Sequence, residues 1–383
     1  MAQDEKALDP AGKRIRAGIL GAGFISDYHI RPLTRLANVE LSGVCDPDRG
    51  KAIACQARWK VLHAFQSLPE MLQSGTVDVV HVLTPPPTHA EAAIACLEAG
   101  CHVFVEKPLA VSEMECRQVG LCAHRRQRSV GVNLNAAYFP VFRRLVDAIE
   151  SWRLGAVQHV TACVNVPLRQ LSAGQHDHWM FREFGNIILE LAPHPLSQIQ
   201  QLLGPVVDCS VLVSGAVRLR SGSVFYDTWQ IALVCQRGTA QLLLSVGREF
   251  LVNTLHVIGQ DGSAFLDLRR NTIGWSEKSR FVDPVDNLRD AVLSASNLAR
   301  QGLANFGDYG AAFLKLKPAS DPFSFSIAAS IRHFYEALEQ GKEPRMGLEA
   351  GTGIIGACER IIQAAGHYLQ LNRDKAFNHA TLS

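Results

Sequence analysis

The sequence predicts an α/β protein in which an N-terminal domain with a parallel sheet precedes an α+β domain with an open, mainly antiparallel sheet. Up to about residue 135, strand-like runs alternate with helical runs, which is the pattern of right-handed βαβ units. Between residues 206 and 270, longer alternating runs follow one another with short turns between them. The length of 383 residues exceeds one ordinary core. We therefore expect a polar tail over 1–13, one domain over 14–135 and a second over 136–383.

Apolar runs place the strands of the first domain. The predicted strands are residues 15–20, 39–45, 61–64, 77–83, 102–105 and 129–133. The run 77–83 is interrupted only by Asp78 and His81, which suits a strand buried on both faces. Helical stretches are expected after the first strand, to about Leu36, and over 88–97, where Gly100 is the stop signal.

The second domain combines helices with a run of strands. Residues 136–204 are predicted to be largely helical around one strand at 157–166. Several strands are predicted over 206–270, for example at 211–217, 225–234, 239–246 and 253–258. Residues 285–305 have apolar positions at three- and four-residue steps and predict a helix with one apolar face. Two further helices are expected, at 325–339 and 348–365.

Composition excludes several classes of protein. The 38 Lys and Arg residues nearly balance the 36 Asp and Glu residues, so nothing indicates binding to nucleic acid or to an anionic membrane. The ten cysteines are scattered without C-x-x-C spacing, which predicts small buried thiols and neither a disulfide framework nor a zinc site. The first 15 residues lack an apolar segment, and no run approaches the ~18 apolar residues of a membrane span. We expect a cytoplasmic setting.

A glycine-rich loop follows the first predicted strand. Gly21 suits the tight turn, and Gly23 lets backbone amides approach a pyrophosphate at the start of a helix. Ser26 takes the place of a third glycine, and Asp46 ends the second strand 20 residues later. The carboxylate of Asp46 suits a ribose hydroxyl and repels a 2′-phosphate, which favours NAD, while Arg49 leaves NADP open. The loop of a Rossmann dinucleotide-binding domain is therefore predicted, and its residues are Gly21, Gly23, Phe24 and Ile25.

Two further motifs follow predicted strands. Residues 84–89 (TPPPTH) come after the strand at 77–83, and residues 106–108 (EKP) come after the strand at 102–105. Both motifs fall at the carboxyl edge of a parallel sheet, where ligands bind in such folds. Pro108 is suited to fix a turn that aims Lys107 into a cleft, although a surface ion pair of Glu106 with Lys107 explains the pattern equally well.

These motifs together resemble the Gfo/Idh/MocA oxidoreductase family over about residues 14–366. The glycine loop, the 84–89 turn, the segment 99–110 (AGCHVFVEKPLA) and a later segment around His194 occur in the order of that family. The resemblance implies an NAD(P)-dependent dehydrogenase of sugars, cyclitols or nucleotide sugars. It also implies a homodimer or homotetramer built through the open sheet. The further cofactor-binding residues that it implies are Thr84, Pro85, His89, Glu106 and Lys107.

The segment 185–198 carries the second predicted group of site residues. Glu190 and His194 lie four residues apart, and Pro193 with Pro195 predicts a kink or a helix start between them. The family pattern is Asp-x-Gly-x-His-x-x-Asp. His194 matches its histidine and Glu190 its first aspartate. The other departures from the family are Ala192 for glycine, Ser197 for aspartate, and Asn135 with Ala136 where an arginine is common.

Lys107, His194 and Glu190 are the predicted catalytic residues. A neutral His194 is the expected base, because the reference pKa of histidine is about 6.5. The ammonium of Lys107 would stabilise alkoxide character on the substrate oxygen, and Glu190 would orient His194 or bind a neighbouring hydroxyl. The reverse assignment, with Lys107 as the base, stays open. The predicted substrate contacts are Lys107, Asn133, His178, Trp179, Glu190 and His194.

Other interpretations remain open. His176 and His178 with Glu190 and His194 could be drawn as a metal site, but we expect none. A redox-neutral NAD-dependent lyase or glycosidase would use the same residues through transient oxidation. A non-catalytic nucleotide-sensing regulator would need neither Lys107 nor His194.

Overall fold

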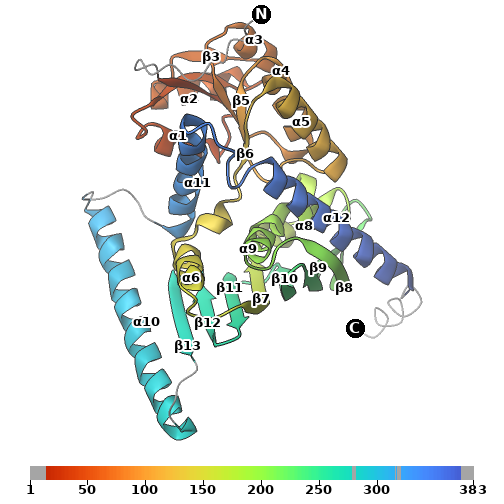
Figure 1. Ribbon diagram of the computed structural model, residues 1–383. Coiled ribbons are helices and arrows are strands. Elements are labelled where there is room, and N and C mark those ends of the chain that lie inside the picture. The colour runs from red at the N-terminus through yellow and green to blue at the C-terminus, as the bar shows by residue number, and fades with distance from the viewer. Residues whose placement is uncertain (1–13, 278–281, 315, 317–320, 372–383) are drawn as a thin grey trace, which may run out of the picture. The chain divides into compact units, whose positions relative to one another are not determined.

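The computed structural model describes residues 14–277, 282–314, 316 and 321–371 (Figure 1). The chain divides into two compact units. Of the described residues, the first contains those from 14 to 134 together with Ile327–Ile355. The second contains the described residues between 135 and 326 and those from 356 to 371.

A six-stranded parallel sheet forms the centre of the first unit, in the order β3-β2-β1-β4-β5-β6. The order reverses between β1 and β4, and in such sheets the crevice at the carboxyl ends of these two strands is where ligands bind. The strands are β1 (Ile15–Leu20), β2 (Val39–Cys45), β3 (His63–Phe65), β4 (Val79–Val82), β5 (His102–Val105) and β6 (Val130–Val132).

Helices connect these strands. Figure 1 shows α4 and α5 packed side by side. Several helices begin at residues suited to the first turn: Asp48 accepts the N–H groups of Gly50 and Lys51, and Ser112 accepts that of Glu115. The elements are α1 (Ser26–Leu33), α2 (Arg49–Trp59), α3 (Leu68–Gln73), the 3₁₀ turn η1 (Pro86–Thr88), α4 (His89–Glu98) and α5 (Glu113–Arg126).

Helix α11 (Pro322–Glu339) completes the core of the first unit. Phe334 packs on Phe104 of β5, with ring centroids 5.0 Å apart. A Cβ at Gly131 of β6 would lie 2.4 Å from the ring of Phe334, so only glycine lets the strand and helix approach this closely. Tyr335 is 1% exposed and reaches His81 of β4. The helix that seals this sheet therefore comes from a distant part of the chain.

A seven-stranded sheet forms the second unit, in the order β13-β12-β11-β7-β10-β9-β8. Only β7 and β10 pair in parallel; the other neighbours are antiparallel. Buried and exposed residues alternate along the strands, so one face is covered and the other open. The strands are β7 (Val157–Val166), β8 (Val206–Arg218), β9 (Val224–Cys235), β10 (Gly238–Val246), β11 (Val252–Gly259), β12 (Gly262–Asp267) and β13 (Thr272–Glu277).

Helices α6 and α9 cover this sheet. Helix α9 packs on β7 and β10, and α6 packs on β12 and β13. The helical elements are η2 (Asn135–Tyr138), α6 (Pro140–Glu150), α7 (Arg169–Ser172), η3 (Trp179–Phe181), α8 (Asn186–Leu191), α9 (Pro193–Leu203) and α10 (Asp283–Phe313). Helix α12 (Leu348–Leu371) has residues in both units, as does α11.

Helix α10 lies along the edge strand β13 (Figure 1) and is attached to it by polar side chains. The amide of Gln301 accepts the N–H of Ile273 and donates to its carbonyl, both at 2.9 Å. The amide of Asn305 donates to the carbonyl of Arg270 at 2.8 Å. Within the described part of the chain, no residue of α10 is buried, and exposed apolar side chains such as Leu303 and Phe306 line it.

The predicted fold class is confirmed. The strands predicted at 15–20, 39–45, 102–105 and 157–166 agree with β1, β2, β5 and β7 at both ends. The predicted strand-rich stretch 206–270 includes β12, although no run was named there, and it ends before β13; the short third strand begins two residues later than predicted. All ten cysteines are free thiols, and eight of them are buried. No helix in the described ranges is both long and apolar enough to span a membrane.

Candidate functional site

Gly21 makes the turn at the end of β1. Its φ of +100° is in the left-handed region that favours glycine. A Cβ at this position would lie 2.8 Å from the carbonyl oxygen of Leu83, which follows β4. The glycine loop therefore meets the end of β4 at the point where the strand order reverses.

Gly23 lies in an open part of the same loop. A Cβ added to it would meet no heavy atom of the described residues within 4 Å. Helix α1 begins three residues later, and its N-terminus provides free N–H groups and partial positive charge. Phe24 is 80% exposed beside the loop, and Ile25 immediately precedes the helix. This space and these donors fit the pyrophosphate of a dinucleotide.

Asp46 holds the glycine loop in place. Its carboxylate accepts the backbone N–H of Ala22 at 2.9 Å and that of Asp48 at 2.9 Å. Asp46 is 8% exposed and directly follows β2. The carboxylate thus ties the second strand to the loop while retaining acceptor positions for a ribose hydroxyl.

His89 joins the 84–89 turn to the Glu106-Lys107-Pro108 motif. Its Nδ1 lies 2.7 Å from the carbonyl oxygen of Pro108, and its Nε2 lies 2.7 Å from that of Thr84. Burial lowers the pKa of His89, and the two carbonyls offset part of this effect. A neutral imidazole donates from one nitrogen only, so one of these contacts is a hydrogen bond at neutral pH. Pro85 is exposed in the same turn.

Glu106 is a buried carboxylate with three donors. Its Oε1 accepts from Nδ2 of Asn133 at 2.6 Å and faces Nε2 of His29 at 2.8 Å. Its Oε2 accepts the backbone N–H of Lys107 at 3.1 Å. Burial raises the pKa of Glu106, but the interactions with His29, the Asn133 hydrogen bond and the charge of Lys107 outweigh burial and lower it to about 2. The side chain of Lys107 is partly exposed, and the Lys107–Pro108 peptide bond is cis.

A chain of buried polar groups continues from Glu106. Nδ1 of His29 lies 3.0 Å from Nδ1 of His81, and Nε2 of His81 lies 3.0 Å from the hydroxyl of Tyr335. His29 and His81 are fully buried. Burial, followed by the neighbouring His29, lowers the pKa of His81 well below its ordinary value, so this imidazole is neutral.

Asn133 has one unsatisfied atom. Its side chain is 2% exposed, and within the described residues its amide oxygen has no hydrogen-bond partner. Exchanging the amide oxygen and nitrogen would place that oxygen against the ionised Glu106, so the orientation is fixed. An unsatisfied buried acceptor costs about 1–3 kcal/mol, which is a cost that a donor group on a ligand would remove.

Glu190 and Trp179 come together in the second unit. The indole N–H of Trp179 donates to Oε2 of Glu190 at 2.9 Å. Helix α8 ends at Leu191 and α9 begins at Pro193, so Glu190 and His194 lie on consecutive helices, as the prolines predicted. His194 is partly exposed, and its carbonyl accepts the hydroxyl of Ser197 at 2.7 Å.

Neither histidine before Trp179 lies in a group of metal ligands. His178 is exposed, and its Nδ1 accepts the N–H of Met180 at 3.4 Å. Among the described residues, no three His, Cys, Asp or Glu side chains lie together in a group that could hold a metal ion.

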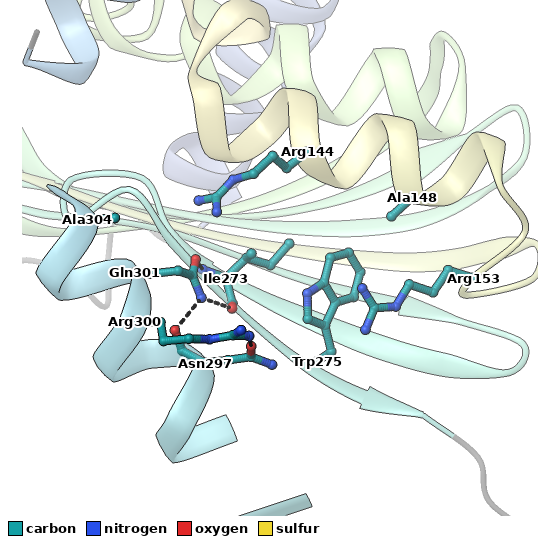
Figure 2. Close-up of a pocket in the computed structure, with 9 residues that line it drawn as sticks. All are labelled: Arg144, Ala148, Arg153, Ile273, Trp275, Asn297, Arg300, Gln301 and Ala304. Carbon is teal, nitrogen blue, oxygen red and sulfur yellow. Dashed lines mark hydrogen bonds between the residues drawn. The ribbon is translucent and has the colours of Figure 1, made fainter. Parts of the chain in front are cut away.

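A separate pocket of the second unit lies between α6, β13 and α10 (Figure 2). The guanidinium of Arg153 lies 4.0 Å from the ring centre of Trp275. None of the predicted site residues lines this pocket. Its lining residues are Arg144, Ala148, Arg153, Ile273, Trp275, Asn297, Arg300, Gln301 and Ala304.

Sequence analysis missed three polar residues of the first unit: His29, His81 and Tyr335. His81 carried a signal, because a histidine inside an otherwise apolar strand is buried and needs a partner. His29 lies one helical turn after Ser26 on α1, and its burial could have been inferred from that spacing. Tyr335 could not have been found, because its partner lies 254 residues away.

Two family models match the chain. Residues 15–134 match the model described as an oxidoreductase family with an NAD-binding Rossmann fold. Residues 142–265 match the GFO/IDH/MocA C-terminal domain. The chain belongs to the Gfo/Idh/MocA family. It therefore has the NAD-binding domain of an oxidoreductase family, which agrees with the open space at Gly23 and with the carboxylate of Asp46.

Members of the family that resemble this chain include inositol dehydrogenases. Inositol 2-dehydrogenase 3 of Saccharopolyspora erythraea is 35% identical over 143 residues, which are 37% of this chain and 42% of that protein. Myo-inositol 2-dehydrogenase of Thermotoga maritima is 25% identical over 265 residues, which are 67% of this chain and 77% of that protein. The match to the first of these relatives thus covers less than half of its length.

Solved structures of the family share the fold. Levoglucosan dehydrogenase in complex with NADH and levoglucosan matches with a TM-score of 0.76 and 16% identity, over 93% of this chain and 98% of that chain. The WlbA dehydrogenase from Bordetella pertussis in complex with NADH and UDP-GlcNAcA matches with a TM-score of 0.73 and 20% identity, over 93% and 96%.

Proposed function

We propose that the protein transfers hydride between a secondary hydroxyl of a sugar, cyclitol or nucleotide sugar and NAD. The observation that carries the proposal is the meeting of three motifs at one sheet edge. Gly21 follows β1, Thr84 follows β4, and Lys107 follows β5, and these are neighbouring strands. Relatives named for inositol and structures solved with sugars or nucleotide sugars support this substrate class.

Asp46 supports NAD as the preferred cofactor. Its carboxylate already fixes the loop through Ala22 and suits the adenosine ribose hydroxyls. A 2′-phosphate beside an ionised carboxylate at this place would be repelled. When bound, NAD supplies the carbon that accepts the hydride.

We assign Lys107 and His194 to the substrate hydroxyl group that loses its proton during the reaction. The ammonium of Lys107 donates a hydrogen bond to the substrate oxygen and stabilises negative charge that develops there. A neutral His194 takes the hydroxyl proton as hydride leaves. Glu190, fixed by the indole of Trp179, binds a neighbouring hydroxyl or orients His194.

Three further residues complete the proposed substrate site. The unsatisfied amide oxygen of Asn133 supports a ligand contact at that residue. His178 and Trp179 lie at the start of a short 3₁₀ turn before α8. They are assigned to substrate binding because their segment leads to Glu190.

The open face of the second sheet supports assembly into a homodimer or homotetramer. Leu243 and Phe265 are 38% and 53% exposed on strands of this face. Apolar side chains on an open sheet face are suited to burial against a second copy of the chain. Light scattering coupled to size-exclusion chromatography tests the assembly, and a monomer at micromolar concentration would contradict it.

The activity is tested by NADH absorbance with a panel of hexoses, inositols and UDP-hexoses. We expect NADH to form with one substrate class and turnover to fall by about 10²-fold or more in Lys107→Ala and in His194→Ala. If NAD binds but no compound yields NADH and no keto-sugar consumes it, the proposal is wrong. Product formation without net NADH would favour the redox-neutral lyase.

A further inference from the structure

Five elements of the first unit are joined by the buried polar chain that ends at Glu106. His29 belongs to α1, His81 to β4 and Tyr335 to α11, while Glu106 and Asn133 follow β5 and β6. The successive contacts from Tyr335 to Glu106 are 3.0, 3.0 and 2.8 Å. In a medium with few polar neighbours, such a chain is stable only when every donor meets an acceptor.

Glu106 sets the direction of the hydrogen bonds. An ionised carboxylate only accepts, so Nε2 of His29 carries a hydrogen and donates to it. In a neutral His29, Nδ1 is then an acceptor, so Nδ1 of His81 must donate. Nε2 of His81 is left as an acceptor, and the hydroxyl of Tyr335 donates to it. From Tyr335 to Glu106, every donor then meets an acceptor and points towards Glu106.

The reversed arrangement leaves one group unsatisfied. If His29 carried both hydrogens, Nδ1 of His81 would accept and Nε2 of His81 would donate to the Tyr335 oxygen. The hydroxyl hydrogen of Tyr335 would then need another acceptor, and the described residues provide none. A buried donor without a partner costs about 1–3 kcal/mol, so the chain takes the first arrangement.

The chain has no exit to solvent at its distal end. His29 and His81 are 0% exposed and Tyr335 is 1% exposed. A chain that stops at a buried hydroxyl cannot deliver protons to water, so its effect is on geometry. That effect reaches Lys107, because the same carboxylate that His29 holds also holds the backbone N–H of Lys107.

We propose that His29, His81 and Tyr335 form a buried positioning chain that fixes Glu106, and through it the backbone of Lys107, relative to the helix that follows the glycine loop. The proposal rests on the proposed function in that it takes Lys107 to act on the substrate. It assigns the three residues no contact with substrate or cofactor.

A matched pair of variants at His29 tests the chain. In His29→Gln the amide nitrogen takes the place of Nε2 and keeps the donor to Glu106. In His29→Asn the amide oxygen takes the place of Nδ1 and keeps the acceptor for His81, but the donor to Glu106 is lost. We expect His29→Asn to lower kcat about 10- to 100-fold with a change in KM for NAD of less than about threefold. His29→Gln should restore most of kcat.

Two controls separate positioning from general destabilisation. Phe334→Leu weakens the same core through its contacts with Phe104 and Tyr335 and removes no hydrogen bond of the polar chain. It should lower the melting temperature without lowering kcat. Tyr335→Phe removes only the last donor, so it should lower kcat by less than His29→Asn does. Equal kcat in His29→Asn and His29→Gln, at equal melting temperature, would overturn the proposal.

Two measurements test the positioning chain without an activity assay. Nitrogen-15 NMR of the histidines should show hydrogen on Nε2 of His29 and on Nδ1 of His81 at neutral pH. Amide hydrogen exchange at Lys107 should quicken about tenfold or more in His29→Asn but stay near wild type in His29→Gln. The opposite tautomers, or unchanged exchange, would refute the chain. If both results hold and no substrate is oxidised, the chain stands and the proposed function fails.

Discussion

The carboxylate of Asp46 accepts the backbone N–H of Ala22 at 2.9 Å, so the residue after β2 holds the loop after β1. Asp46→Ala removes this acceptor and also the charge that would repel a 2′-phosphate. We expect NAD affinity to fall about fivefold, since one such hydrogen bond contributes about 1 kcal/mol, and the ratio of NAD affinity to NADP affinity to decrease. Titration calorimetry with both dinucleotides measures the two affinities.

Asp48→Ala is the matched control for Asp46. Asp48 caps α2 through Gly50 and Lys51 and does not contact Ala22. Its replacement should cost about 1 kcal/mol of stability and leave the ratio of the two affinities unchanged. An unchanged ratio in Asp46→Ala as well would show that Asp46 does not select the cofactor.

Substitutions of the two loop glycines, Gly21 and Gly23, distinguish an effect on stability from an effect on NAD binding. Gly21→Ala places a Cβ 2.8 Å from the carbonyl oxygen of Leu83 in a left-handed conformation, so we expect a loss of about 2 kcal/mol or more in stability. Gly23→Ala meets nothing in the described protein, so its stability should stay near wild type. The added methyl group should instead remove the rise in melting temperature that NAD produces. Thermal unfolding with and without NAD measures both effects, and NAD stabilisation that persists in Gly23→Ala would contradict the predicted pyrophosphate site.

His102 makes stability depend on pH. Burial, and then the charge of Arg128, lowers the pKa of His102 to about 4, and its Nδ1 accepts the N–H of Ser129 at 3.0 Å. Between pH 4 and about 6.5 the unfolded state therefore binds more protons, so stability falls as the pH is lowered through this window. From pH 7 to pH 5 we expect His102 to account for a loss of about 2 kcal/mol.

His102→Asn removes the titration and keeps an acceptor for Ser129. Urea unfolding at pH 7 and pH 5 should show a smaller difference in the variant than in wild type. Some difference should remain, because burial also lowers the pKa of His81 and His89. Equal pH dependence in both proteins would contradict the neutral state assigned to His102.

Trp179→Phe tests the hydrogen bond between the indole of Trp179 and the carboxylate of Glu190. The change removes the donor at 2.9 Å while keeping an aromatic ring, so we expect kcat/KM to fall about tenfold. A double-mutant cycle with Glu190→Gln should give a coupling energy of about 1 kcal/mol. Phe184→Leu is the control, because Phe184 packs on Trp229 with ring centres 5.1 Å apart and its ring carries no donor for the carboxylate of Glu190. If the effects of the two substitutions on kcat/KM simply add, Trp179 does not act through Glu190 and its place in the proposed site is wrong.

Local patterns predicted β1, β2 and β5 well because each is a short apolar run near a glycine or proline turn. The ends of β1, β2 and β5 follow directly from such punctuation. The same patterns predicted the break between Glu190 and His194, since Pro193 lacks the N–H that a continuous helix needs.

Contacts between distant segments could not be predicted in this way. The pairing of His81 with Tyr335 and the packing of Phe334 on Phe104 join α11 to a sheet more than 200 residues earlier in the sequence. Periodicity reports which face of a helix is apolar but not which surface that face meets. The strand β13 was missed because it contains Gly274 and ends in polar residues, so its apolar run is short.

The amide of Gln301 has a consequence for how the second sheet ends. This amide hydrogen-bonds both the N–H and the C=O of Ile273, which are the backbone groups with which an additional strand would pair with β13. Asn305 takes the carbonyl of Arg270 on the same side. Helix α10 thus occupies the place of an additional strand beside Ile273, which hinders strand-by-strand growth into fibrils at this edge without a proline, a lysine or a bulge in β13 itself.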